Sequence, residues 1–289
     1  MIFSNKKHLT LLLIPALLVL FIFAIYPVIQ VTIYSFMEVD FNANESHFIG
    51  LQNYRDLLDD WFFTTSIQNT VQFSIVASVI QVILGLILAI LFNRNFPGKR
   101  FALPIIIYPM MLSTLVCSAI WRSWYHYDFG MLNHWLGLIG IEPIEWLFNP
   151  SLALYSVILV DVWQWTPMTF LIVLAGLQSI PQDIREAART DGANELQVLC
   201  YITLPMIKGH IMLALLLRTL DTFKIFDKVY ALTDGGPGNA TETMSVFVYR
   251  NGFKFFEIGL ASAASVFMLA IACALSIVYA TKILGDQNK

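Results

Sequence analysis

The chain has 289 residues, of which 57% are hydrophobic and only 13% are charged, and its mean hydropathy is +0.68. Soluble domains carry about a quarter charged residues, so this composition excludes a soluble globular protein and indicates a polytopic membrane protein. The net charge of −3 says little about partners, and no basic run suggests nucleic acid. Cys117, Cys200 and Cys273 are far apart and are interpreted as small apolar residues, not as a disulfide or zinc framework.

Six segments are long and apolar enough to cross a bilayer, because a hydrocarbon core about 30 Å thick needs roughly 20 helical residues. The fourth contains one charge, Asp161, and the fifth is apolar only in its first half. We therefore predict an all-α fold of six membrane-spanning helices within residues 9–282. The predicted spans are residues 9–36, 66–92, 101–121, 151–180, 209–232 and 258–281. The first continues through Pro27, far beyond the length of a signal peptide, so it is predicted to be an uncleaved anchor.

The distribution of basic residues predicts the orientation, because loops on the cytoplasmic side are enriched in lysine and arginine. Residues 1–8, the 93–100 loop, the 181–208 segment and residues 283–289 then face the cytoplasm, and the acidic loops 37–65 and 123–150 face outward. Lys224, Lys228, Arg250 and Lys254, around the last outer loop, do not fit this pattern. We interpret Lys224 and Lys228 as lying at the outer end of a span whose upper half lines water.

The loops contain no recognisable catalytic or metal-binding pattern. Residues 51–62 have the spacing of an amphipathic helix lying at the lipid interface, and Pro167 predicts a break within the fourth span. His126 and His134 have no acid or cysteine at ligand spacing. The glycine-rich run 233–243 lacks the lysine of a phosphate-binding loop, so it is predicted to be a tight turn. We expect no enzyme activity and no bound cofactor or metal in this chain.

The segment 181–208 has helical patterning but too many charges to cross a membrane. Pro181 and Asp183 favour a helix start, and Gly192 is expected to end or bend that helix. A second amphipathic segment follows over residues 195–204, and Pro205 is expected to separate it from the fifth span. The small face of Ala187 and Ala188 indicates a docking surface for a soluble partner. On physical grounds alone, a plain connecting helix remains the alternative.

The same segment resembles the EAA loop of the membrane subunits of binding-protein-dependent ABC importers. The matching residues are Glu186, Ala187, Ala188, Asp191, Gly192, Ala193, Ile202, Leu204 and Pro205. The runs "FIGLQNY" and "LTDGGPGNATET" resemble the maltose-type carbohydrate permeases. Cys200 and Tyr201 depart from the usual aromatic-basic pattern. The chain also lacks the extra N-terminal spans and large outer domain of the enteric maltose permease subunit, so contacts made by those parts are not carried over.

This resemblance implies a type I importer (MetI-like) permease fold in a bacterial inner membrane. It implies a sugar substrate, a second homologous permease subunit, two cytoplasmic ATPase subunits that bind ATP and magnesium, and an extracytoplasmic solute-binding protein. The EAA loop would dock on an ATPase and couple ATP hydrolysis to the spans. A secondary transporter or channel, which needs no ATPase, is the alternative class.

The fifth span carries charges that are costly in a membrane, at roughly 2.5–3.5 kcal/mol each. Arg218 would lie about 14 Å along the helix, and Arg218, Asp221 and Lys224 follow one another at intervals of three, which allows pairing. By the resemblance, the sugar-contact positions are Gln164, Trp165, Met168, Arg218, Asp221, Thr222 and Ile225. A purely structural Arg218–Asp221 pair remains the alternative, and the sequence does not indicate which sugar is carried.

Overall fold

The computed structural model describes residues 13–15, 17–40 and 45–287. The predicted cytoplasmic residues 1–8, the start of the first predicted span and residues 288–289 lie outside this part of the chain. Two compact units are present, Met1–Phe63 with Phe247–Ala270, and Thr64–Val246 with Ile271–Lys289. The long helices α4 (Trp61–Phe92) and α15 (Ile258–Gln287) each contribute to both units.

The first unit contains a small β-hairpin that the sequence analysis missed. The π-helical segment η1 (Phe21–Ile25) and α2 (Tyr26–Tyr34) lead into β1 (Met37–Asp40), which pairs antiparallel with β2 (Glu45–Phe48). Helix α3 (Gln52–Asp59) follows, and its Asn53 amide donates hydrogen bonds to the carbonyls of Ser35 and Met37 at 3.0 and 2.9 Å. This buried amide fixes the hairpin to α3.

The predicted interfacial helix is shorter than its sequence pattern. Helix α3 ends at Asp59 because Asp60 has an extended backbone, with φ −75° and ψ 115°. The Asp60 carboxylate accepts a hydrogen bond from the Phe62 backbone N–H at 2.7 Å and so caps the next helix. Trp61 and Phe62 therefore belong to α4, which carries their apolar side chains into a long helix.

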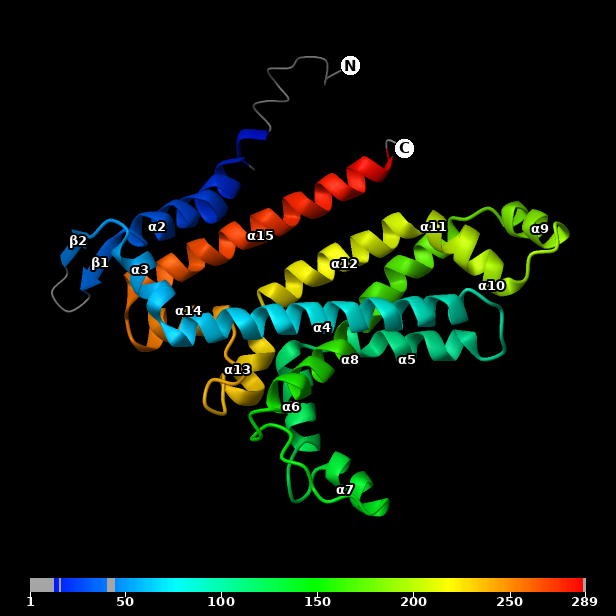
Figure 1. The fold of residues 1–289 in the computed structure, drawn as a ribbon, viewed down its shortest axis with the longest axis horizontal. Helices are drawn as coiled ribbons and strands as arrows, with labels where there is room; N and C mark the ends of the chain where they lie inside the picture. The colour runs from blue at the N-terminus through cyan, green and yellow to red at the C-terminus, as the bar shows by residue number, and fades with distance from the viewer. Residues whose placement is uncertain (1–12, 16, 41–44, 288–289) are drawn as a thin grey trace. The chain divides into compact units, whose positions relative to one another are not determined.

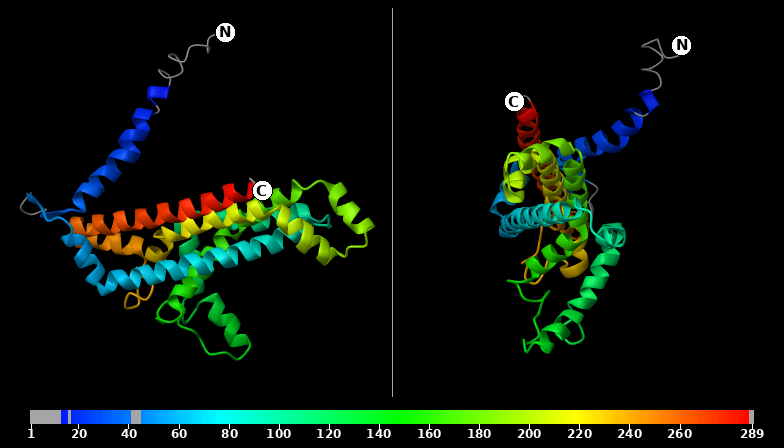
Figure 2. Two further views of the ribbon diagram at one scale, coloured as in Figure 1. Left: turned by 45° about the horizontal axis from the view of Figure 1, so that its top comes forward. Right: turned by 90° about the vertical axis from the view of Figure 1, so that its right-hand side faces the viewer.

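The second unit consists of helices grouped around α8 (Ala153–Gln178), which lies against α5 and α12 (Figures 1 and 2). The other helices described in this unit are α5 (Lys99–Met111), α6 (Thr114–Trp124), α7 (Met131–Leu138), α9 (Gln182–Thr190), α10 (Glu195–Gln197), α11 (Leu204–Met206), α12 (Lys208–Phe223) and α13 (Asp227–Thr233). Helix α14 (Met244–Tyr249) contributes to both units, because the second unit ends at Val246. The π-helical segments η2 (Val198–Thr203) and η3 (Arg250–Lys254) precede α11 and follow α14, and η3 belongs to the first unit.

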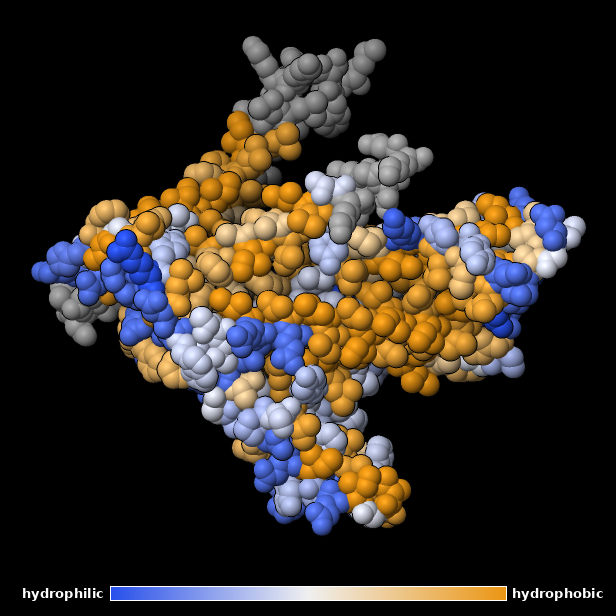
Figure 3. All heavy atoms as spheres, in the orientation of Figure 1, coloured by the Kyte–Doolittle hydropathy of each residue, from blue (hydrophilic) through white to orange (hydrophobic). Residues whose placement is uncertain are grey.

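Two apolar clusters surround α8, one near each end. Val157 and Val160 of α8 pack in the first cluster with Trp121, and Phe170 and Leu177 pack in the second. The middle of α8 approaches α4 so closely that a Cβ on Gly85 would lie 2.9 Å from the Thr169 Cβ. Figure 3 shows that the visible surface of α5 and of the later part of α4 is mainly hydrophobic, whereas hydrophilic residues gather over the first part of α4 and over α9 and α10.

Among the described residues, four helices are long and apolar enough to cross a membrane, and two bent helix pairs raise the number to six. The straight candidates are Leu13–Tyr34, Trp61–Phe92, Ala153–Gln178 and Ile258–Thr281. The third predicted span is a bent pair: α5 and α6 meet at 99° because Leu112 and Ser113 are extended. The second bent pair is Glu195–Met206 with Lys208–Phe223, so it begins before the predicted fifth span, residues 209–232. That predicted span is itself interrupted, since α12 ends at Phe223 and α13 begins only at Asp227.

Prolines act differently from the predictions made for them. Helix α8 continues through Pro167 without a break. Pro205 lies within α11, and the change in direction comes two residues later, at Ile207, where α12 begins after a bend of 63°. The predicted tight turn over residues 233–243 is present, with Gly235 at φ +84° and the hydroxyls of Thr233 and Thr241 2.8 Å apart.

Candidate functional site

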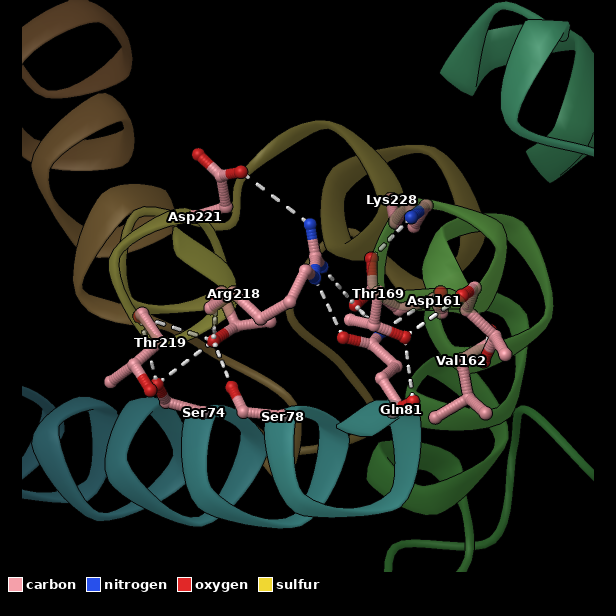
Figure 4. A network of polar contacts seen from close by, with 12 residues as sticks. Ser74, Ser78, Gln81, Asp161, Val162, Thr169, Arg218, Thr219, Asp221 and Lys228 are labelled. Carbon is pink, nitrogen blue, oxygen red and sulfur yellow. Dashed lines mark hydrogen bonds and ion pairs between the residues drawn. The ribbon is translucent and has the colours of Figure 1, made fainter. Parts of the chain in front are cut away.

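A buried polar network joins four helices of the second unit (Figure 4). Asp161 of α8 accepts hydrogen bonds from Arg218 of α12 at 3.0 Å, from Gln81 of α4 at 2.8 Å, and from Lys228 of α13. The Arg218 Nε atom also donates to the Gln81 side-chain oxygen at 2.7 Å. The four side chains are no more than 1% exposed, so the network is closed to solvent. Asp161 is therefore the centre on which two cations converge.

The second acid of the network lies at its exposed side. Asp221 is 41% exposed, 3.5 Å from Arg218 and 3.2 Å from Lys224. The pairing expected from the spacing of three is present, but the shorter contact of Arg218 is with Asp161. Asp161 was predicted only as a lone charge in its span, without partners. Gln81 was not predicted to belong to a site, and its only sequence signal is an amide side chain in an otherwise apolar span.

Lys228 differs most from its predicted position. It was expected near water at the outer end of the fifth span, but it is fully buried. The reason is the interruption after Phe223, which lets α13 change direction and bring the Lys228 ammonium to Asp161. The free carbonyl of Ile225 within this interruption accepts a hydrogen bond from the Thr243 hydroxyl at 3.0 Å. Only Lys224 of the two lysines is exposed.

Trp165 lies beside the network, half-buried on α8. The Arg218 guanidinium carbon is 5.1 Å from the ring centroid and the Lys228 ammonium is 5.8 Å from it. Both distances are within the range of cation–π attraction, which holds the indole beside the two cations. Met168, one helical turn further along α8, is also half-buried. The structure thus brings Trp165 and Arg218 together.

Gln164 occupies a different environment from its neighbour Trp165. Its amide nitrogen donates to the Leu112 carbonyl at 2.9 Å, at the bend between α5 and α6. Its amide oxygen is buried and has no partner among the described residues. The side chain therefore satisfies a carbonyl freed by the broken span and retains one unused acceptor.

Thr222 and Ile225 face other parts of the unit. The Thr222 hydroxyl is fully buried against α4, 2.9 Å from the Ser74 hydroxyl and 3.1 Å from that of Ser78. Ile225 packs at the edge of the apolar cluster that contains Trp121. In this conformation the Thr222 hydroxyl is enclosed between α12 and α4, and the grouping of these residues around a solute stays a prediction.

The 181–208 segment contains the expected helix, α9, which Figure 1 shows at the edge of the second unit. Ala187 is exposed and Ala188 is half-buried, and Glu186 accepts a hydrogen bond from Gln182 at 2.7 Å. Helix α9 stops at Thr190, and Gly192 follows with φ +88°, a conformation that favours glycine.

The chain then turns into the second expected segment. Asp191 and Ala193 donate backbone hydrogen bonds to the last turn of α9, and the Asn194 side chain caps α10. An ion pair of 2.7 Å between Arg189 and Glu195 spans the turn. Leu204 is half-buried and Pro205 is exposed just before the bend at Ile207.

Comparison with known proteins decides the family. The family described as the binding-protein-dependent transport system inner membrane component matches residues 81–283. The chain belongs to this family. The prediction of an all-α permease is thereby confirmed, and the family's role identifies a transport component of the inner membrane, not an enzyme.

Relatives of this permease cover most of its length. It is 43% identical over 237 residues to a probable ABC transporter permease protein of Sinorhizobium fredii, covering 81% of this chain and 76% of that protein. It is 36% identical over 269 residues to the trehalose/maltose transport system permease protein of Thermococcus litoralis, covering 93% and 91%. A bacterial alginate ABC transporter, solved with an alginate pentasaccharide-bound periplasmic protein, shares the fold with a TM-score of 0.83 at 22% identity, covering 95% and 93%.

Proposed function

We propose that this permease is the translocating subunit of an ATP-driven carbohydrate importer. The observation that carries the proposal is the match along 91% of a trehalose/maltose permease, which includes both the coupling segment and the polar network. A second permease subunit, two ATPase subunits that bind ATP and magnesium, and an extracytoplasmic solute-binding protein complete the transporter. This chain would supply half of the pathway and hold no cofactor.

Helix α9 is the proposed contact with the ATPase. The exposed small side chain of Ala187 permits close approach of another backbone, and Leu196 and Tyr201 are 69% and 79% exposed on the segment that follows. Exposed apolar side chains rimmed by charges are typical of a protein interface. Glu186, Ala187 and Ala188 would enter the partner, with Asp191, Gly192 and Ala193 as the turn and Leu204 and Pro205 as the link to α12.

The proposed solute surface centres on Trp165. A sugar has an apolar face that packs on an aromatic ring and a polar edge that bonds to neighbouring groups, here Asp221. Gln164 would reach the same solute only in a conformation that exposes it, because its side chain is now buried and bonded to the Leu112 carbonyl. Met168 and Arg218 would border the same surface. Thr222 and Ile225 would reach a solute only in a conformation in which α12 has moved away from α4, because their present contacts occupy them.

The proposed orientation places both termini and residues 181–208 in the cytoplasm, as the distribution of basic residues indicates. Helix α9 would then meet the ATPase on the side where ATP is present, and the hairpin of the first unit would face outward.

Purification and uptake together test the proposal. The tagged chain should co-isolate with a second permease and an ATPase, and vesicles containing the complex should take up radiolabelled trehalose or maltose only when supplied with ATP and the solute-binding protein. Uptake by this chain alone, driven by an ion gradient and insensitive to ATP, would instead establish a secondary transporter. Failure of every sugar tested, with ATP-dependent uptake of a non-sugar solute, would remove the carbohydrate assignment alone.

A further inference from the structure

A second polar site lies in the second unit, away from the buried network. A cavity of about 230 Å³ separates the segment that follows α9 from the ends of α4 and α8. Asn93 and Arg94, directly after α4, and Thr203 of η2 are among the residues that line it. The proposed importer mechanism gives this cavity no role.

Three hydrogen-bond donors of this cavity have no partner among the described residues. They are the Asn93 amide, the Arg94 guanidinium and the Thr203 hydroxyl. Thr203 is only 5% exposed as a residue, and it lines the cavity. A hydroxyl without a protein partner in such a cavity is available to bond to a ligand.

The charges at the cavity favour an anion. Arg189 and Glu195 form an exposed ion pair at its rim and compensate each other. Arg94 has no acidic partner in the described part of the chain, so the lining carries one excess positive charge. Charged and neutral donors that line the same cavity match the oxygens of a phosphate group.

The volume of the cavity and its apolar floor restrict the class of ligand that fits it. Its 230 Å³ is smaller than the roughly 300–1,000 Å³ typical of sites for drug-sized ligands, so a whole nucleotide does not fit. The floor is apolar, formed by Ile90, Leu177, Val198 and Leu199. Basic pockets between membrane-spanning helices on the cytoplasmic side are typical sites for anionic lipid head groups.

We propose that this cavity binds the phosphate head group of an anionic phospholipid and thereby holds the coupling segment against the ends of α4 and α8. The inference goes beyond the proposed function and uses only its membrane orientation. The phosphate would accept hydrogen bonds from Asn93, Arg94 and Thr203, with the upper part of the lipid against the apolar floor. Because η2 connects α9 to α11 and α12, a bound lipid would limit the positions available to α9.

Lipid binding to the assembled transporter tests the proposal directly. Phosphatidylglycerol is titrated in micelles of a neutral detergent, and native mass spectrometry measures the lipid-bound fraction. Arg94→Gln should weaken binding about tenfold or more, as expected for loss of one charge-assisted hydrogen bond. Thr203→Val, which keeps the shape but removes the hydroxyl, should weaken binding about threefold. Arg100→Gln is the matched control, since Arg100 lies in the same loop but does not line the cavity.

Three results would overturn the proposal. Equal phosphatidylglycerol binding by the wild type and Arg94→Gln would show that the cavity is not the lipid site. Displacement of the lipid by inorganic phosphate would identify a soluble anion as the occupant. Phosphatidylglycerol binding by the permease subunits alone, but not by the assembled transporter, would assign the cavity to the interface with the ATPase.

A functional measurement adds to the binding result. In phosphatidylcholine vesicles, added phosphatidylglycerol should raise the ATP-driven uptake of the wild type and of Arg100→Gln but not of Arg94→Gln. An equal rise in all three would contradict the proposed role of the cavity. The lipid titration is measured without solute or ATP, so a wrong sugar assignment would leave the titration result unaffected.

Discussion

Removing the Asp161 carboxylate should destabilise the permease more than removing either cation that it binds. Asp161→Leu leaves both Arg218 and Lys228 buried without their shared acid. Breaking a buried ion pair by removing one partner costs about 3–5 kcal/mol, and here one substitution strands two charges. Arg218→Leu should cost less, roughly 1–3 kcal/mol, because Asp161 keeps Lys228 and only the bonds of one guanidinium are lost.

A double variant separates the stranded charge from simple loss of packing. Asp161→Leu/Lys228→Leu removes one charge of each sign and leaves Arg218 with Gln81 and Asp221. It should therefore recover about 2 kcal/mol relative to the single Asp161 variant, within the usual range of coupling between contacting residues.

Equilibrium unfolding of the detergent-solubilised protein in sodium dodecyl sulfate, followed by far-UV circular dichroism, gives the free energy of unfolding of each variant. Asp161→Asn serves as a control of matched size and polarity that also removes the charge, and it should resemble Asp161→Leu. The reasoning is refuted if the double variant is as unstable as Asp161→Leu, or if Arg218→Leu is the more damaging single change.

Three further predictions concern the proposed transport cycle. Trp165→Ala should raise the KM for sugar about fivefold, as expected for loss of roughly 1 kcal/mol of aromatic contact, with subunit assembly unchanged; an unaltered KM would exclude Trp165 from the solute surface. Gly192→Val should lower ATP-driven uptake, because a β-branched residue is strained by about 1–2 kcal/mol or more at φ +88°. Gly209→Val is the control and should not lower uptake, because Gly209 lies in the helical first turn of α12. Equal uptake by both variants would contradict a special role of the turn. A membrane-impermeant thiol reagent added outside intact cells should label Glu45→Cys but not Glu195→Cys, and labelling of the latter would reverse the proposed orientation.

The existence of the membrane helices followed from the sequence, whereas their interruptions did not. Length and hydropathy identify the helices because the bilayer thickness sets a minimum apolar run. The bend at Leu112 depends on tertiary contacts, since the carbonyl freed there is bonded by Gln164 from another helix. Pro167 illustrates the converse: neighbouring helices kept α8 continuous where the residue alone predicted a break.

The sequence identified which charged residues belong to the candidate site better than it identified which residues each of them contacts. Asp161 and Arg218 were recognisable as charges in apolar spans, where an unpaired charge is costly. Spacing along one helix could pair Arg218 only with Asp221, because contacts between helices are not encoded in that spacing. Lys228 was misplaced for the same reason, since its position depends on where α12 ends. The β-hairpin was missed because strands of four residues give too short a pattern to recognise.

The shared carboxylate also has a consequence for how the chain is made. Asp161 is 57 residues ahead of Arg218 and 67 residues ahead of Lys228, so both of its cations are synthesised later. At about 5–20 residues per second, α8 leaves the ribosome on the order of 3–13 s before its charge is compensated. During that interval the nascent helix carries an unpaired acid that is unfavourable in lipid. A chain truncated before α12 never acquires those partners. Its α8 would keep an uncompensated acid, so stable insertion of α8 depends on sequence that follows it in the chain.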